Sequence, residues 1–197
     1  MSQSRTKVDR FFLTLTLILV FFGAAMFTSA SLGVLAKNAK LFYSVLTTQL
    51  VLGLGLGFLG MYISSKIDYK IWKKYAFYIF LLTILLTAGV YVPGLGFSHG
   101  GALRWIELGP ISFQPAEILK FGFIIYFAAW LSHVKTKVED FRYGLLPLGI
   151  MLFIIAFILL NQPDTKSFIL ISITGIAMLF VGGVPLRYLF GALGIIV

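Results

Sequence analysis

Long apolar stretches alternate with short polar segments along almost the whole chain. Each of six stretches has roughly the 20 mostly apolar residues that a helix needs to cross a bilayer, within a range of about 17–25. They are Phe11–Ala30, Leu41–Ile63, Tyr75–Val92, Pro115–Leu131, Tyr143–Leu160 and Phe168–Val184. Large apolar side chains surround each predicted helix on all sides, which is typical of helices in lipid. The pattern predicts an all-α fold: a polytopic transmembrane helix bundle, built as a single integral membrane domain over residues 1–197.

A further apolar stretch, Tyr188–Val197, follows Arg187 at the end of the chain. At 1.5 Å per residue it is too short for a hydrocarbon layer of about 30 Å. We therefore expect six spans plus the start of a seventh, and we interpret the chain as the truncated N-terminal part of a longer protein.

Composition narrows the class of protein further. Apolar residues make up 59% of the chain and charged residues 12%, against about 45–50% and about 25% in soluble domains. With a mean hydropathy of +0.99, these values exclude a soluble enzyme, a disordered tail and a nucleic-acid binder, despite the net charge of +9. The chain has no Cys and only two, widely separated His residues, so we predict no metal site.

The distribution of Lys and Arg predicts the orientation. Eleven of the 16 Lys and Arg residues fall in segments that are cytoplasmic if the N-terminus is cytoplasmic, as the positive-inside rule requires. These basic inner segments also favour contacts with anionic membrane lipids. The longest loop, residues 93–114 between the third and fourth helices, then lies outside.

This outer loop contains a short amphipathic stretch with Arg104, Trp105 and Glu107. Tryptophan is typical of headgroup depth, and arginine forks two phosphate oxygens, so the stretch suits a lipid-linked phosphate. The alternative is an interfacial anchor with an Arg104–Glu107 pair at i,i+3 spacing.

The next segment places three polar residues at i,i+3 spacing, namely Gln114, Glu117 and Lys120. Pro115 fits the first position of a helix. A lysine more than one turn inside an apolar helix indicates a polar pocket or pathway with a partner, here Glu117. The alternative is a helix-locking ion pair without a ligand.

A third outer cluster surrounds Asp164. Asp164 either caps the sixth helix, with Ser167 at the third helical position, or binds a hydroxyl or a cation. Its spacing alone does not choose between the two. The segment is Asn161-Gln162-Pro163-Asp164-Thr165-Lys166-Ser167.

Taken together, these outer motifs resemble the SEDS family of FtsW, RodA and SpoVE proteins. The first signature is Gly100-Gly101-Ala102-Leu103-Arg104-Trp105-Ile106-Glu107-Leu108-Gly109, followed by Phe113-Gln114-Pro115-Ala116-Glu117-Ile118-Leu119-Lys120. The second is Asn161-Gln162-Pro163-Asp164. The match is closer to the FtsW branch than to the RodA branch.

The resemblance implies a multi-pass peptidoglycan glycosyltransferase of the bacterial cell membrane, active in cell division, cell shape and cell-wall synthesis. Such proteins have about ten helices and polymerise lipid II, a disaccharide-pentapeptide on undecaprenyl pyrophosphate. Their partners are a class B penicillin-binding protein and other divisome proteins, and a divalent cation is an optional cofactor. The implied substrate-binding residues are Arg104, Trp105, Gln114, Glu117, Lys120 and Asp164.

Two departures from the family pattern qualify these expectations. The glycine that usually opens the sixth helix is replaced by Lys166, which changes how closely a ligand approaches the backbone there. The family's catalytic aspartate is expected beyond Val197, so the catalytic residue is unknown and the chain alone is expected to be inactive. A lipid II flippase and a non-catalytic division scaffold are the alternative functions.

Overall fold

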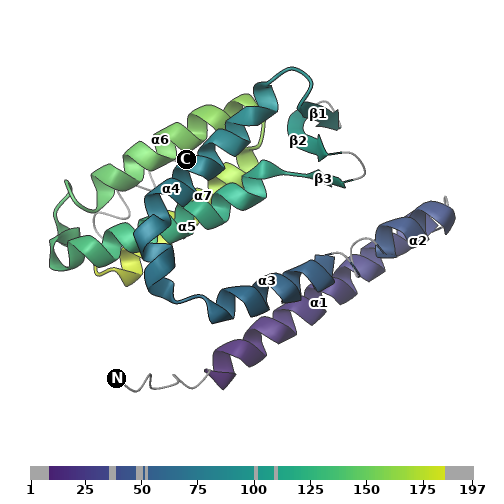
Figure 1. Ribbon diagram of the computed structural model, residues 1–197, viewed down its shortest axis with the longest axis horizontal. Coiled ribbons are helices and arrows are strands. Elements are labelled where there is room, and N and C mark those ends of the chain that lie inside the picture. The colour runs from purple at the N-terminus through teal and green to yellow at the C-terminus, as the bar shows by residue number, and fades with distance from the viewer. Residues whose placement is uncertain are drawn as a thin grey trace. The chain divides into compact units, whose positions relative to one another are not determined.

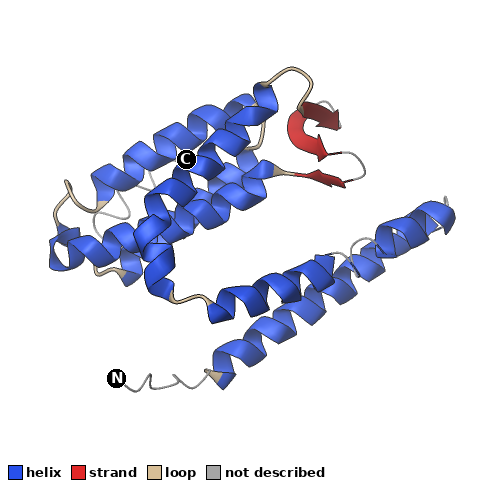
Figure 2. Cartoon of the chain, viewed as in Figure 1, coloured by secondary structure: helices blue, strands red, loops and turns tan. Residues whose placement is uncertain are grey.

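The computed structural model describes residues 9–35, 39–47, 51, 53–99, 102–108 and 111–184. Contacts divide the chain into two compact units, Met1–Ile67 and Asp68–Val197. Helices dominate both units, and a small sheet belongs to the second (Figures 1 and 2). The expected seventh helix at Tyr188–Val197 lies outside the described residues.

The described residues of the first unit include the α-helices α1, α2 and α3. Helix α1 (Arg10–Leu35) begins where Asp9 accepts a hydrogen bond from the Phe12 N–H at 3.1 Å, which satisfies one of the free donors at the helix start. Helices α2 (Ala39–Thr47) and α3 (Gly55–Lys66) follow. The predicted span Leu41–Ile63 falls on these two helices, with residues 48–50 and 52 outside the described part.

The second unit is a helix bundle. Helix α4 (Tyr69–Ala88) leads into the 3₁₀ turn η2 (Gly89–Tyr91). Pro115 opens α5 as predicted. The remaining elements are α5 (Pro115–Val134), the 3₁₀ turn η3 (Lys135–Glu139), α6 (Leu145–Asn161) and α7 (Thr165–Val181).

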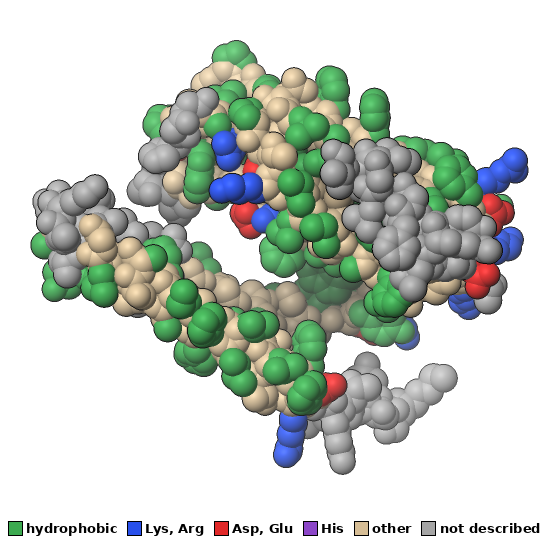
Figure 3. All heavy atoms as spheres, turned by 180° about the vertical axis from the view of Figure 1, so that it is seen from behind, with side chains coloured by type: hydrophobic (Ala, Val, Ile, Leu, Met, Phe, Trp, Pro, Cys, Tyr) green, Lys and Arg blue, Asp and Glu red, His purple; other side chains and the backbone are tan. Residues whose placement is uncertain are grey.

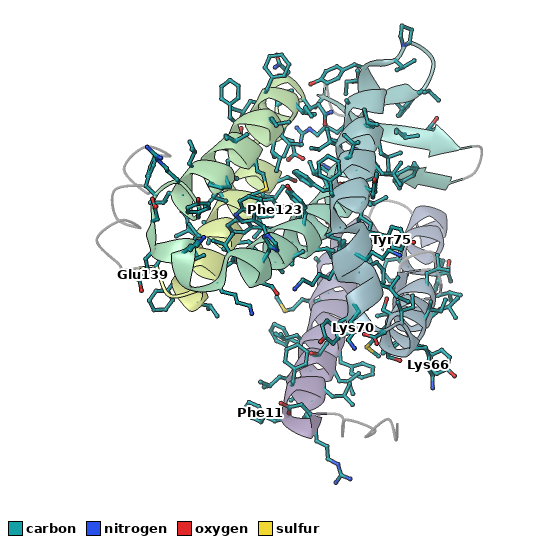
Figure 4. All side chains as sticks on the ribbon, turned by 60° about the vertical axis from the view of Figure 1, so that its left-hand side comes forward. Phe11, Lys66, Lys70, Tyr75, Phe123 and Glu139 are labelled. Atoms are coloured by element: carbon teal, nitrogen blue, oxygen red, sulfur yellow. The ribbon has the colours of Figure 1, made fainter. Side chains whose placement is uncertain are left out.

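Large apolar side chains fill the centre of this bundle. Phe123, Leu119 and Phe127 of α5 are completely buried, and they pack with Ile155 of α6 and Ile171 of α7. Figure 4 shows Phe123 inside the bundle. The outer faces of the helices are apolar as well, as the hydrophobic side chains in Figure 3 show. A helix that is apolar on every side belongs in lipid, because water would penalise its outer face.

In the described part of the chain, three segments are long and apolar enough to cross a membrane, namely Arg10–Gly33, Tyr69–Tyr91 and Pro115–Val134. Helices α6 and α7 are also apolar but have 17 residues each. The predicted fifth and sixth spans fall on these two helices. The polytopic helical fold is therefore confirmed, while the single domain over residues 1–197 stays a prediction.

The loop over residues 93–114 contains a three-stranded antiparallel sheet, which the sequence pattern did not predict. Strands β1 (Gly96–His99), β2 (Ala102–Leu108) and β3 (Ile111–Phe113) pair in the order β1-β2-β3. Gly96 lies so close to the Val90 carbonyl that a Cβ there would collide with it. The sheet is thereby held against η2 at the C-terminal end of α4.

Helices α4 and α5 approach each other closely at Gly122. A Cβ at position 122 would collide with the Thr83 hydroxyl oxygen and lie 2.9 Å from its Cγ2. Small residues permit such contact between membrane helices. This contact fixes α5, whose first turn carries part of the candidate site.

Candidate functional site at the sheet end of the bundle

A β-bulge sets the position of Arg104. Phe97 pairs with Trp105 and Ser98 pairs with Leu103, so Arg104 is an extra residue with no partner across from it on β1. Bulges interrupt a ladder and redirect a side chain, and they are frequent next to functional sites. Here the guanidinium is directed toward the start of α7.

Asp164 forms an ion pair with this guanidinium and is almost completely buried. Its Oδ1 lies 3.9 Å from Arg104 Nη1, and its side chain is 3% exposed against 32% for Arg104. Oδ1 also accepts a hydrogen bond from the Ser167 N–H at 3.3 Å, as expected for a helix cap. The predicted cap is confirmed, and the same carboxylate also pairs with a cation.

Gln114 completes the cluster from the start of α5. Its Nε2 donates a hydrogen bond to Asp164 Oδ2 at 2.9 Å. The backbone of Gln114 is extended rather than helical. We name Arg104, Gln114 and Asp164 the outer cluster, because they join β2, α5 and α7 at the sheet end of the bundle.

Arg104 retains a donor for a further group. Its Nε is buried and makes no hydrogen bond to any residue in the described part of the chain. Leaving a buried donor without an acceptor costs about 1–3 kcal/mol. The Arg104 side chain as a whole is 32% exposed, so an anionic oxygen can reach the accessible N–H groups of the guanidinium, and the site suits a phosphate or carboxylate ligand.

The interpretation of Arg104 and Glu107 as a helical i,i+3 pair is wrong. The segment is a strand, in which residues three apart lie on opposite faces. Glu107 is exposed and pairs in register with Ser112 of β3. The ion partner of Arg104 is Asp164, 60 positions later in the chain.

Glu117 and Lys120 form the predicted pair on α5. Lys120 Nζ lies 2.7 Å from Glu117 Oε1. Glu117 is 59% exposed and Lys120 is 20% exposed, so the pair faces outward at the helix start. Gln114 does not share this face, because its amide turns to Asp164 instead.

Trp105 lies opposite Phe97 in the β1–β2 pair and is partly exposed. Cross-strand aromatic neighbours stabilise a hairpin. Trp105 therefore supports the strand that carries Arg104, and no described contact links it to the outer cluster.

A second hydrogen-bond network, which the sequence analysis missed, lies directly beneath the outer cluster. Gln162 is 2% exposed and donates to the Thr87 carbonyl at 2.9 Å. The Tyr91 hydroxyl donates to the Ile158 carbonyl at 2.7 Å. These bonds join the ends of α4 and α6. The motif that contains Gln162 is recognisable in the sequence. The hydrogen-bond partner of its side chain is not, because that partner is a backbone carbonyl 75 positions earlier in the chain.

The fold and the site together define a polytopic membrane protein with a polar, anion-compatible cluster at one end of its helix bundle. A family model described as cell cycle protein, covering FtsW, RodA and SpoVE, matches residues 9–197. The chain belongs to this family.

Relatives share about a third of their residues with the chain. The probable peptidoglycan glycosyltransferase FtsW of Geobacter sp. (strain M18) is 36% identical over 183 residues, covering 93% of this chain and 50% of that protein. The protein of the same description from Polynucleobacter necessarius subsp. necessarius (strain STIR1) is 30% identical, covering 97% of this chain and 46% of its own length. The chain spans about half the length of these relatives.

Two solved structures share the fold. The rod shape determining protein RodA of Thermus thermophilus has a TM-score of 0.68 at 24% identity, covering 92% of this chain and 57% of that chain. A chain of a peptidoglycan synthase complex that coordinates polymerization and crosslinking has a TM-score of 0.70 at 26% identity, covering 91% and 50%.

Proposed function

We propose that this chain forms part of a peptidoglycan glycosyltransferase of the FtsW kind, and that its outer cluster binds the pyrophosphate of lipid II at the outer face of the cell membrane. The observation that carries this proposal is the partly exposed guanidinium of Arg104, which faces Asp164 and whose Nε has no partner among the described residues. A pyrophosphate offers the anionic oxygens that a guanidinium binds as a fork. The similarity to proteins described as FtsW peptidoglycan glycosyltransferases supplies the reaction.

The residues divide into a binding group and a positioning group. Arg104 and Lys120 would neutralise the phosphate charge, which a leaving pyrophosphate requires. Asp164 and Gln114 would hold Arg104 in place, and we assign no catalytic base in this chain. The described residues contain no group of three or more His, Asp and Glu side chains that could hold a metal ion. A divalent cation remains an optional cofactor in this proposal.

A chimera tests the proposed glycosyltransferase activity. It can be built because this chain aligns with half of the Geobacter protein. In the chimera this chain replaces the matching half of that protein, and glycan strands are measured from purified lipid II. We expect polymerisation by the chimera, and a loss of about tenfold or more in Arg104→Ala, since a hydrogen bond to a charged group contributes about 1.5–3 kcal/mol.

The chain by itself is expected to bind undecaprenyl pyrophosphate without polymerising lipid II. A chimera that moves lipid II across vesicles but forms no glycan would favour a flippase. The scarcity of buried charge weighs against a flippase. Among the described residues, Asp164 is the only charged side chain that is buried, and it lies at the sheet end of the bundle. A continuous polar path across the bilayer would need more.

Partners follow from the same proposal. One similar chain belongs to a peptidoglycan synthase complex. We propose that a class B penicillin-binding protein joins this chain to add crosslinking, and that other divisome proteins recruit the pair during division.

The orientation is a further part of the proposal, with the N-terminus in the cytoplasm. A reporter fused after Lys74 or Lys137 is expected to be cytoplasmic, and one fused at Ser98 is expected to lie outside, because of the Lys and Arg asymmetry. Accessibility of each fusion to a membrane-impermeant label measures this. Protection of the Ser98 site in intact cells would place the outer cluster on the wrong face.

The Glu117–Lys120 pair requires a double substitution to separate its two possible roles. Lys120→Ala alone leaves Glu117 without its partner, and because Glu117 is 59% exposed, this lowers stability by about 1 kcal/mol or less in addition to any loss of ligand binding. Glu117→Gln combined with Lys120→Met removes both charges at once. We expect the double variant to recover folding but not polymerisation in the chimera. Full polymerisation by the double variant would show that the pair only stabilises the helix.

A further inference from the structure

The end of the second unit opposite the sheet carries a concentration of cations. Helix α4 begins there and α5 ends there, so the outer cluster lies at the far end of both helices (Figure 1). Charged side chains gather at this end (Figure 3), and Figure 4 shows Lys70 near the start of α4. The cations are Lys70, Lys73, Lys74, Lys135, Lys137 and Arg142.

The three carboxylates at this end, Asp68, Glu139 and Asp140, balance only half of the six cations. Asp68 accepts a hydrogen bond from the Lys70 N–H at 2.9 Å, and Asp140 accepts one from the Arg142 N–H at 3.0 Å. Both therefore act as local caps. Among the described residues, the ion pairs within 4.0 Å are Arg104–Asp164 and Lys120–Glu117. Neither pair lies at this end, so in the described part of the chain these cations form no ion pair with Asp68, Asp140 or the exposed Glu139.

Lys73 is fixed by a neighbouring helix. Its Nζ donates a hydrogen bond to Ser132 Oγ of α5 at 2.7 Å. The ammonium and the hydroxyl are therefore presented together from two helices. The ammonium keeps two further donors, and the hydroxyl keeps its own proton for an acceptor. Positive charge at the start of α4 also opposes the helix dipole, so an added anion would relieve two unfavourable terms.

The surroundings of these lysines indicate which kind of anion they would meet. Beyond these lysines, the exposed face of α4 becomes apolar. It carries Tyr75, Tyr78, Leu82 and Leu85, a surface that is typical of contact with lipid. The lysines thus lie at headgroup depth, where Tyr and Trp side chains are also frequent. Trp72 and Trp130 lie at this level, and the Trp130 Nε1–H donates to the Tyr143 carbonyl at 2.9 Å. Phospholipid phosphates are the anions of highest local density at that depth.

We propose that Lys70, Lys73, Lys74 and Ser132 form a binding site for the headgroup of an anionic phospholipid. Lys73 and Ser132 contact the phosphate, and Lys70 and Lys74 provide the charge that prefers an anionic over a zwitterionic lipid. The site is independent of the outer cluster and of the glycosyltransferase proposal.

Tryptophan fluorescence tests this site directly. The chain has three tryptophans, and Trp105→Phe leaves Trp72 and Trp130, both next to the proposed site. This variant is reconstituted in phosphatidylcholine vesicles that contain either brominated phosphatidylglycerol or the same fraction of brominated phosphatidylcholine. We expect stronger quenching by the brominated phosphatidylglycerol. Equal quenching by the two lipids would overturn the proposal.

Single substitutions assign the preference to named residues. A lysine beside an anionic surface contributes roughly a fivefold preference. Lys73→Gln is therefore expected to reduce the relative affinity for phosphatidylglycerol about fivefold, and Lys70→Gln/Lys73→Gln/Lys74→Gln to abolish the preference. Lys166→Gln is the matched control, because Lys166 is an exposed lysine at the opposite end of the bundle. Equal effects of Lys73→Gln and Lys166→Gln would contradict a localised site. Circular dichroism confirms that each variant retains its helices.

Discussion

Replacing Asp164 by alanine is expected to destabilise the protein more than any other removal of a carboxylate in the described part of the chain. The substitution removes the cap of α7, which contributes about 1 kcal/mol. It also removes the acceptor of Gln114, and a hydrogen bond to a charged group contributes about 1.5–3 kcal/mol. Because such neighbouring contributions are not additive, we expect a total loss of about 2–3 kcal/mol.

Thermal unfolding in detergent, followed by circular dichroism, measures this loss. Asp140→Ala is the matched control, because Asp140 is exposed and accepts one backbone hydrogen bond, from Arg142. We expect it to cost about 0.5 kcal/mol or less. Asp164→Asn is expected to fall between the two, since asparagine is also a good cap but carries no charge for Arg104. Equal unfolding temperatures of Asp164→Ala and Asp140→Ala would show that the outer cluster does not hold α5 and α7 together.

Gly122→Ala is expected to separate α4 from α5. The added methyl group would collide with the Thr83 side chain, and overpacking of a tight contact costs about 1–3 kcal/mol. Since α5 carries Glu117 and Lys120 and begins directly after Gln114, the displacement is also expected to reduce polymerisation in the chimera. Thermal unfolding in detergent measures the first effect, and glycan synthesis measures the second.

Gly149→Ala provides the control for this substitution. Gly149 is also a helical glycine, but nothing lies within 4 Å of a Cβ added there. Alanine is favoured over glycine inside a helix by about 0.5–1 kcal/mol, so this variant is expected to be as stable as the parent or more stable. Thr83→Ala combined with Gly122→Ala is expected to recover part of the loss, because the hydroxyl and Cγ2 are then absent. If Gly122→Ala unfolds at the same temperature as Gly149→Ala, the two helices can move apart without cost.

The sequence was most informative where a pattern is local. Apolar length predicted the spans, Pro115 marked the start of α5, and Asp164 with Ser167 indicated the cap of α7. The pair of Glu117 and Lys120 is likewise local. The last three of these features each depend on residues within one turn of a helix, so spacing brought them into view. Spacing did not by itself choose between the alternatives for Asp164 or for the Glu117–Lys120 pair.

The outer cluster was not predictable in the same way. Its hydrogen bond from Gln114 to Asp164 joins residues 50 positions apart, and no periodicity encodes that distance. The helical spacing of Arg104 and Glu107 gave a wrong prediction for a different reason. Residues 102–108 alternate only partly between apolar and polar types, and Arg104 and Glu107 also fit helical spacing. Pairing with β1 and β3 decides the outcome, and pairing is a tertiary property.

The bulge at Arg104 restricts how the hairpin can change in length. Deleting residue 104 would restore a regular ladder between β1 and β2, and the hairpin itself would gain a backbone pairing. The same deletion would remove the only guanidinium that reaches Asp164 in the described chain. A regular strand and ligand binding therefore require different lengths of this segment. A hairpin shortened by one residue would pair more regularly, but it would lack the guanidinium that could hold a phosphate.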